Sequence, residues 1–388
     1  MRMTMHSAAK LGATMGAIGV FSLLAGCTSW NPFAKTPANA PLALVNFTAS
    51  MSPKLSWSYS IGRAGVAVFS PAYAAESVFV AAADGSLARL DAASGKPQWR
   101  ISVGSGLSAG VGSDGDSVAV VGTKGVLMVF DGSGKLRWKE QLPSEVLSAP
   151  AVGDGAVVVR SGDNRVIAFD AQTGSKRWTS LRTVPSLILR GAPGLLIDSG
   201  TVYVGQPGGK LLALNSINGG PRWETVVGES RGATELERVS DVVGRPILAE
   251  HEICATSYQS RLACFDLGTG VVRWNKELSS QVGPAMDARF VFAADVKGVV
   301  SGFSREAGQS VWRNEKLLYR DLSAPLSIGR AVAVGDYKGI IHFLSREDGS
   351  FLARMETDGS PVTGSPLVAA GRAVFQTQAG TVVAIATE

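Results

Sequence analysis

The 388-residue sequence contains few of the side chains from which metal or redox sites are built. It has three cysteines, none adjacent to another, and three histidines, so metal sites based on these ligands are poorly supplied. Basic residues exceed acidic ones by five, but after residue 26 no run of Lys or Arg is longer than two, which argues against a nucleic-acid-binding surface. The charge-free apolar run at 11–24 is shorter than the about 20 residues that a membrane-spanning helix needs.

The first 26 residues are typical of a lipoprotein signal peptide. Arg2 and Lys10 precede the apolar run, which closes on the L-A-G-C sequence that ends at Cys27 and resembles a bacterial lipobox. The resemblance implies that Cys27 is lipidated, and Thr28 after it favours the outer membrane. The alternative is an ordinary signal peptide that happens to carry a cysteine. Residues 27–52 are rich in Pro, Ala, Asn, Ser and Thr and predict a flexible tether before a folded domain at 53–388.

A strand-turn-strand unit recurs along this domain. In its first full copy, Asp84–Trp99, alternating side chains predict a strand with one buried face, followed by the turn Asp91–Gly95 and a strand that carries a lone tryptophan. Further copies, the last two degenerate, begin at Gly125, Asn164, Gly209, Ser260, Gly298, Gly339 and Gly380. A repeat of about forty residues that is built from short strands is typical of a β-propeller.

Each unit extends backwards into two more strands, the first of which usually contains a proline. The sequence therefore predicts an all-β, eight-bladed β-propeller of four-stranded antiparallel blades. The last unit reaches Glu388 without a fourth strand, whereas Trp57 precedes the first unit at the spacing of the other tryptophans. We predict that the strand with Trp57 completes the eighth blade, so that the N- and C-terminal strands pair, and that the tryptophans pack between blades.

The units, of the form [Asp/Asn]-x-x-[Thr/Ser/Asn]-G-x-x-x-W, resemble the PQQ-type repeats of quinoprotein dehydrogenases and their non-catalytic relatives. Together with the lipobox they resemble the propeller lipoproteins of the outer-membrane β-barrel assembly machinery, over essentially the whole mature chain. This resemblance implies a non-catalytic, lipid-anchored scaffold on the periplasmic side of the outer membrane, without a cofactor, that aids insertion of outer-membrane proteins. It also allows direct binding of unfolded outer-membrane proteins at exposed blade edges.

A catalytic alternative would need groups that the chain supplies poorly. The resemblance to quinoprotein dehydrogenases implies an aspartate base, a calcium site and usually a pair of adjacent cysteines, and that pair is missing. Asp91, Asp131, Asp170 and Asp266 stand where third strands meet turns, so we expect them to accept turn amides. We therefore predict no enzyme. A quinoprotein-like periplasmic dehydrogenase is the first alternative, and a periplasmic scaffold for another partner is the second.

Cys254 and Cys264 flank a predicted hairpin turn at Tyr258–Ser260. Antiparallel pairing about Gln259 places them directly opposite each other, and the predicted periplasmic location is oxidising. The pattern favours a cross-strand disulfide, and two free buried thiols are the alternative.

Two neighbouring links between blades form the candidate partner-binding surface. The link from Trp223 to Pro246 is the one clear insertion in the ring and is rich in charged residues. The preceding link contains V-P-S-L-I-L-R-G at 184–191, where polar residues are expected. If Ile188 enters the next strand and is buried, Leu187 and Leu189 lie on the other side beside Arg190, as an apolar anchor.

The resemblance points to the same links. In the assembly lipoproteins a P-S-L-x-L-R-G loop and an acidic S-D-V motif bind the POTRA modules of the membrane-embedded subunit. Position by position, this implies partner contacts by Leu187, Leu189, Arg190 and Asp241. The family often has a second aspartate where this chain has Val243. Asp241 has two open roles: contact with the partner, or pairing with Arg190 to brace the loop.

Overall fold

The computed structural model describes residues 39–229 and 231–387, and Cys27 lies outside this part of the chain. The chain divides into two units, Met1–Ala40 and Pro41–Glu388, and the second contains all the described strands. No helix among the described residues is long and apolar enough to cross a membrane.

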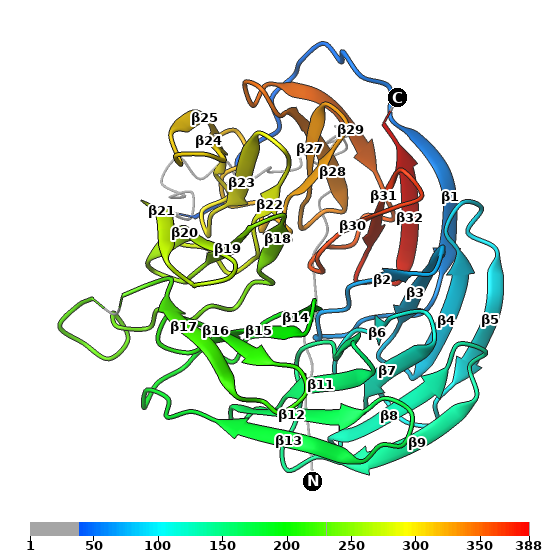
Figure 1. Cartoon of the computed structure of the whole chain (residues 1–388). Helices are drawn as coiled ribbons and strands as arrows, with labels where there is room; N and C mark the ends of the chain where they lie inside the picture. Colours follow the sequence, from blue (N-terminus) through cyan, green and yellow to red (C-terminus); the bar gives the residue numbers. More distant parts are fainter. Residues whose placement is uncertain (1–38, 230, 388) are drawn as a thin grey trace, which may run out of the picture. The chain divides into compact units, whose positions relative to one another are not determined.

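The unit Pro41–Glu388 is a ring of eight sheets, each with four antiparallel strands (Figure 1). This confirms the predicted eight-bladed propeller. The first strand of each blade lies nearest the centre and the fourth lies at the rim (Figure 1). The recurring proline directly precedes most first strands, where its missing N–H costs no ladder hydrogen bond.

Every blade has one strand at each of four positions between the centre and the rim. The first strands are β2 (Ala72–Ala74), β6 (Gly112–Ser113), β10 (Ala151–Gly153), β14 (Leu195–Asp198), β18 (Ile247–Ala249), β22 (Ala285–Met286), β26 (Leu326–Ile328) and β30 (Leu367–Ala369). The second strands are β3 (Ser77–Ala81), β7 (Ser117–Val121), β11 (Ala156–Arg160), β15 (Thr201–Gln206), β19 (Glu252–Thr256), β23 (Phe290–Ala294), β27 (Ala331–Gly335) and β31 (Arg372–Gln376). The third strands are β4 (Ser86–Asp91), β8 (Val126–Asp131), β12 (Arg165–Asp170), β16 (Lys210–Asn215), β20 (Arg261–Asp266), β24 (Val300–Ser304), β28 (Ile340–Ser345) and β32 (Thr381–Ala386). The fourth strands are β5 (Pro97–Ser102), β9 (Leu136–Gln141), β13 (Lys176–Leu181), β17 (Pro221–Val226), β21 (Val272–Glu277), β25 (Ser310–Asn314), β29 (Phe351–Glu356) and β1 (Lys54–Ser60).

The ring closes in the eighth blade, where strands from both ends of the chain meet. β1 pairs antiparallel with β32 (Figure 1). In this pairing Trp57 lies opposite Ala384. The predicted pairing of the terminal strands is thus confirmed. It leaves no blade with a missing fourth strand.

The third strands differ from the prediction of a single buried face. In β4, Leu87 packs into the core between blades one and two, whereas Ala88 and Leu90 pack into the core between blades eight and one. All three side chains are fully buried. Because every blade lies between two neighbours, both faces of its middle strands are covered, and an alternating sequence does not mark one face as exposed.

Tryptophans join successive blades, as predicted. Trp57 donates its indole N–H to the carbonyl of Ala92 in blade one at 3.0 Å, and its ring lies against Gly95. Gly95 has a φ of 70°, and a Cβ there would come within 2.5 Å of the indole, so glycine is required twice over. The same bond is made to the next blade by Trp99, Trp138, Trp178, Trp223, Trp274 and Trp312.

Blade seven has Ala353 at the tryptophan position, and the segment 41–53 covers its outer strand instead. The amides of Ser50 and Met51 donate to the carbonyl of Leu352 in β29. The ring of Phe47 stacks on Phe351 at a centroid distance of 5.2 Å. We expected a flexible tether over 27–52, but its part from 41 onwards is packed on the propeller, because this outer strand carries apolar side chains that need covering.

A buried polar network holds the same segment. Asp336 is fully buried and pairs with Arg320 at 2.6 Å and with His342 at 3.0 Å. Arg354 donates to Nδ1 of His342 at 3.1 Å and also to the carbonyl of Val45 at 2.8 Å. Burial lowers the pKa of His342, so its neutral ring accepts from Arg354 at Nδ1 and donates to Asp336 at Nε2. The network fixes segment 41–53 through its backbone.

Candidate partner-binding site

The candidate site consists of the two links on either side of blade four. The first link, 182–194, joins β13 to β14, and the second, 227–246, joins β17 to β18. Ser186 donates its hydroxyl to Glu235 at 3.1 Å, and the Leu189 amide donates to Oδ2 of Asp241 at 2.6 Å. The two links therefore lie side by side and form one surface.

Asp241 is buried beneath this surface, with 3% of its area exposed. Besides the Leu189 amide, its carboxylate accepts the amide of Gly208, from the turn between β15 and β16, at 2.9 Å. Its own carbonyl accepts the amide of Tyr258, from the turn between β19 and β20, at 2.9 Å. Asp241 thus holds three segments together through backbone groups. Of the two roles left open by the sequence, this geometry supports bracing of the loop.

The apolar run of the first link does not enter a strand, because β14 begins only at Leu195. The Leu187 residue is 41% exposed, whereas Ile188 and Leu189 are both half-buried. The expectation that Leu189 is as exposed as Leu187 therefore does not hold, since the hydrogen bond to Asp241 keeps the Leu189 backbone against the second link. Leu187 is the most exposed of the three aliphatic side chains.

Arg190 pairs with Glu145 and not with Asp241. The distance from its Nη2 to Oε2 of Glu145 is 2.6 Å, and the two side chains are 73% and 42% exposed. Glu145 lies in the link before blade three, far from Arg190 in sequence, and no local pattern marks it as a partner. An ion pair this exposed contributes only about 0–1 kcal/mol to stability. Arg190 can therefore exchange Glu145 for another anionic group with little loss of free energy.

The second link contains a short capped turn. Thr234 Oγ1 accepts the amide of Glu237 at 3.3 Å, and the Glu237 carboxylate accepts the amides of Thr234 and Ala233 at 3.0 and 2.8 Å. These bonds, the one from Thr234 first, lower the pKa of Glu237. Leu236 in this turn is 68% exposed. The acidic side chain of Glu237 is thus used to order the insertion.

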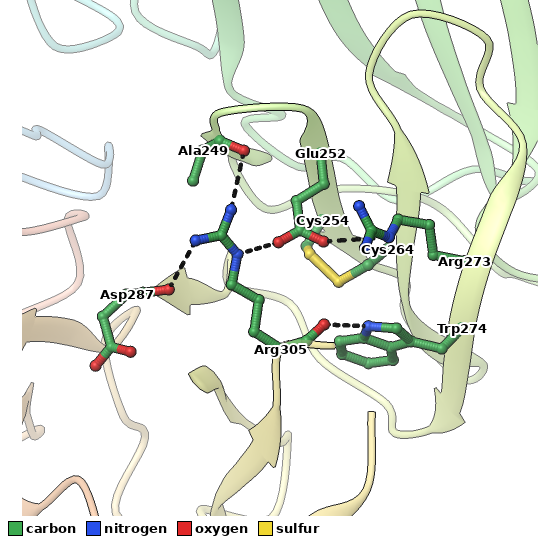
Figure 2. Close-up of a disulfide and its surroundings, with 8 residues drawn as sticks. All are labelled: Ala249, Glu252, Cys254, Cys264, Arg273, Trp274, Asp287 and Arg305. Carbon is green, nitrogen blue, oxygen red and sulfur yellow. Dashed lines mark hydrogen bonds and ion pairs between the residues drawn. A yellow bond between two sulfur atoms is a disulfide. The ribbon is translucent and has the colours of Figure 1, made fainter. Parts of the chain in front are cut away.

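A disulfide joins Cys254 in β19 to Cys264 in β20 (Figure 2). The two residues are directly opposite each other in the ladder, with Cα atoms 4.1 Å apart, and both are fully buried. Their hairpin ends in the turn that contains Tyr258, whose amide binds the Asp241 carbonyl. The disulfide thus lies in the hairpin that supports the second link.

A buried carboxylate lies beside the disulfide and connects blades five and six. Glu252 is 2% exposed and contacts the guanidinium groups of Arg305 and Arg273 (Figure 2). The carbonyl of Arg305 in turn accepts the indole N–H of Trp274 at 2.8 Å (Figure 2). Paired charges of this kind are structural, because removal of either partner would leave a buried charge alone.

The aspartates at the ends of third strands bind their own turns, as predicted. Asp91 accepts the amide and the hydroxyl of Ser94 at 2.8 and 2.6 Å, and these bonds lower its pKa. The corresponding bonds to turn residues are made by Asp131, Asp170 and Asp266. Their side-chain oxygens are thus bound to turn residues.

A cavity of about 1200 Å³ lies among the first strands and the links that precede them. Most of its lining residues are small or aliphatic, and its charged residues include Arg245 and Asp321. Among the described residues no group of three or more His, Cys, Asp or Glu is arranged to hold a metal ion. Ser108 stands in a G-L-S-A-G sequence like that of a hydrolase nucleophile, but it lies in a link between strands and donates to the carbonyl of Val146 at 2.7 Å.

Comparison with known proteins identifies the relatives of this fold. A family model described as "Outer membrane protein assembly factor BamB" matches residues 83–314 and 296–388. The protein of that name from Burkholderia pseudomallei is 41% identical over 372 residues, which cover 96% of this chain and 97% of that protein.

Solved structures are also similar. The crystal structure of BamB from Moraxella catarrhalis has a TM-score of 0.79 and 28% identity, and the match covers 86% of this chain and all of that one. A quinohemoprotein alcohol dehydrogenase from Pseudomonas putida has a TM-score of 0.68 over 86% of this chain and 76% of that one, but only 14% identity. That second likeness extends to the fold alone.

Proposed function

The chain belongs to the BamB family of outer membrane protein assembly factors, and we propose that it binds the periplasmic POTRA modules of the membrane-embedded assembly subunit. It is a non-catalytic accessory lipoprotein of the β-barrel assembly complex, since its relatives are named assembly factors and its likeness to dehydrogenases is confined to the fold. Its contribution is to organise the partner's modules and so to aid insertion of outer-membrane proteins.

The main support for the proposed site is that the apolar loop in link 182–194 is held in place by a buried residue, Asp241. Leu187 projects from link 182–194, and Asp241 joins the backbone of this link, at Leu189, to the turn between β15 and β16, at Gly208. A rigid loop loses little conformational entropy when a partner binds, so its exposed side chains contribute more to affinity. Leu187 and Leu189 would pack against the partner, and Arg190 would set orientation through a charged contact.

The proposed membrane attachment limits where the propeller can lie. We propose that Cys27 carries the lipid and that the propeller faces the periplasm from the outer membrane. Since residues from 41 onwards pack on the propeller, only residues 28–40 separate the anchor from the folded unit. Thirteen residues span at most about 45 Å when fully extended. Unfolded outer-membrane strands would have only the rim strands of the blades available for pairing.

The test is an affinity pull-down from solubilised envelopes. Wild-type protein is compared with a variant that combines Leu187→Ala, Leu189→Ala and Arg190→Ala, with folding checked by circular dichroism. Ile217→Ala serves as the control, because Ile217 is 74% exposed in the turn between β16 and β17, on the opposite face of the same blade.

The proposed function and site predict that wild type and the Ile217→Ala protein capture the assembly complex and that the folded triple variant does not. Capture by all three proteins would retain the function and reject the site. Failure of wild type to capture the complex would reject the proposed partner.

A further inference from the structure

A small cavity lies directly behind the first link. Its volume is about 190 Å³, and its walls come from the link before blade three, from the end of β11 with the turn that follows it, and from residues 188–193. Since a water molecule occupies about 30 Å³ in the liquid, the cavity has room for one side chain of a partner. It adjoins the loop that carries Leu187, and its wall combines aliphatic side chains with the polar groups of Glu145, Arg160 and Arg190.

Arg160, at the end of β11, lines this cavity. Its Nε donates to the side-chain oxygen of Asn164 at 2.8 Å. Among the described residues, its two Nη nitrogens have no hydrogen-bond partner, and no carboxylate lies within ion-pair distance of the guanidinium. An arginine has five N–H donors, so four remain available to a ligand.

The surroundings make this a site for an anion. The other charged residues of the cavity wall are Arg190 and Glu145, which pair with each other at 2.6 Å, so Arg160 has no ion-pair partner in the wall. The charge of Asp241 acts on Arg160 from outside the cavity wall, but both oxygens of Asp241 accept backbone amides and neither is hydrogen-bonded to the guanidinium. Burial lowers the pKa of Arg160 to about 10, so the group is still charged at neutral pH.

We infer that this cavity receives an aspartate or glutamate side chain of the partner and that Arg160 is the residue that binds it. The inference rests on the proposed function and adds a second contact to it. Leu187 provides an apolar anchor on the outside of the loop, and the carboxylate enters behind the loop. A guanidinium and a carboxylate form paired, charge-assisted hydrogen bonds whose geometry requires one orientation, so the contact selects the register of docking.

The test measures the affinity of the purified POTRA modules for wild type and for Arg160→Gln. Arg165→Gln is the matched control, because Arg165 starts the next strand of the same hairpin and its side chain is 42% exposed and paired with Asp163. We expect Arg160→Gln to weaken binding at least about tenfold, Arg165→Gln to leave it unchanged, and Arg160→Lys to restore part of it. Equal affinity of the wild-type and Arg160→Gln proteins would overturn the inference while leaving the proposed function intact.

A second variant, at Glu145, tests whether removing a negative charge beside Arg160 strengthens binding. Glu145→Gln removes a negative charge from the cavity wall, where Glu145 pairs with Arg190, so it should tighten binding of an acidic side chain, and weaker binding would contradict the inference. The acidic residues of the modules can then be replaced one at a time and the affinity of each variant measured. The residue that enters the cavity is the one whose replacement weakens binding to wild type but has no further effect on binding to the Arg160→Gln protein.

A direct ligand titration separates this inference from the proposed function. N-acetylglutamate should shift the Nε–H resonance of Arg160 in the whole protein and leave that of Arg165 in place. If the modules do not bind wild type, the proposed function fails, and this titration still decides whether the cavity binds carboxylates. No shift at Arg160 would reject the site.

Discussion

Replacing Asp241 by asparagine removes the charge beneath link 182–194 without changing the size of the side chain. In the wild-type protein its two oxygens accept the amides of Leu189 and Gly208 at 2.6 and 2.9 Å. An asparagine can keep one oxygen in place, but its NH₂ group then faces the other amide donor. One backbone amide is therefore left without an acceptor at a site where Asp241 is 3% exposed.

The expected cost follows from these bonds. A hydrogen bond to a charged group contributes about 1.5–3 kcal/mol to stability, and a buried donor left without an acceptor costs about 1–3 kcal/mol. Allowing for overlap between the two effects, we expect opening of the link to become easier by about 2–4 kcal/mol, which is about a 30- to 700-fold change in an equilibrium constant. We expect the cost to be local, because the carboxylate binds amides of two connections and none of the strands.

Hydrogen exchange measures this opening directly. In Asp241→Asn the amides of Leu189 and Gly208 should exchange faster, while amides in β28 of blade seven keep their wild-type rates. Asp163→Asn is the control, since that carboxylate lies on the surface of the neighbouring hairpin. Unchanged protection at both Leu189 and Gly208 would refute the bracing role. Faster exchange throughout the propeller would show that Asp241 stabilises the whole fold and not the link.

Three further outcomes are expected from substitutions, and a fourth from pH. Trp57→Ala should lower the free energy of unfolding by about 3–5 kcal/mol in denaturant titrations, because a large buried side chain of the closing strand is lost; a change below about 1 kcal/mol would contradict its role in closure. Replacing Cys254 and Cys264 together by alanine should cost about 2–4 kcal/mol by the same measurement, and no loss would show that the hairpin is ordered without the bond. Arg354→Met should increase protease cleavage within 41–51 by removing a bond to that segment, and equal cleavage would show that apolar contacts suffice. Burial lowers the pKa of His342 below 6.5, so between these two pKa values the unfolded chain binds a proton that the folded protein does not. The free energy of unfolding should therefore fall as pH decreases from about 6.5 towards the lower pKa of the folded state. Replacement of His342 by glutamine should abolish this part of the pH dependence.

The repeat architecture could be read from local sequence because each unit carries its own turn and its own tryptophan. The position of Trp57 even predicted which strand closes the ring, since the spacing between a tryptophan and the next blade is set by the geometry of one link. The register of Cys254 and Cys264 followed in the same way from a short hairpin. These features depend on residues that are neighbours in the chain or repeat at a constant interval.

The role of Asp241 could not be read in this way, because its partners Leu189, Gly208 and Tyr258 come from three different connections. Nor could the packing of segment 41–53, whose composition is typical of a tether but whose backbone is held by a network inside blade seven. In both cases the decisive contacts join segments that are distant in sequence.

The sequence by itself thus determined the number of blades, the strand that closes the ring and the two links that form the candidate site. Only the tertiary structure decided which side chains of those links are available. It buries Asp241 beneath the loop, places Glu145 against Arg190 and leaves the guanidinium of Arg160 facing a cavity without a carboxylate partner. The physical reason is that strand periodicity and turn chemistry act over a few residues, whereas burial and ion pairing depend on which blades the ring brings together.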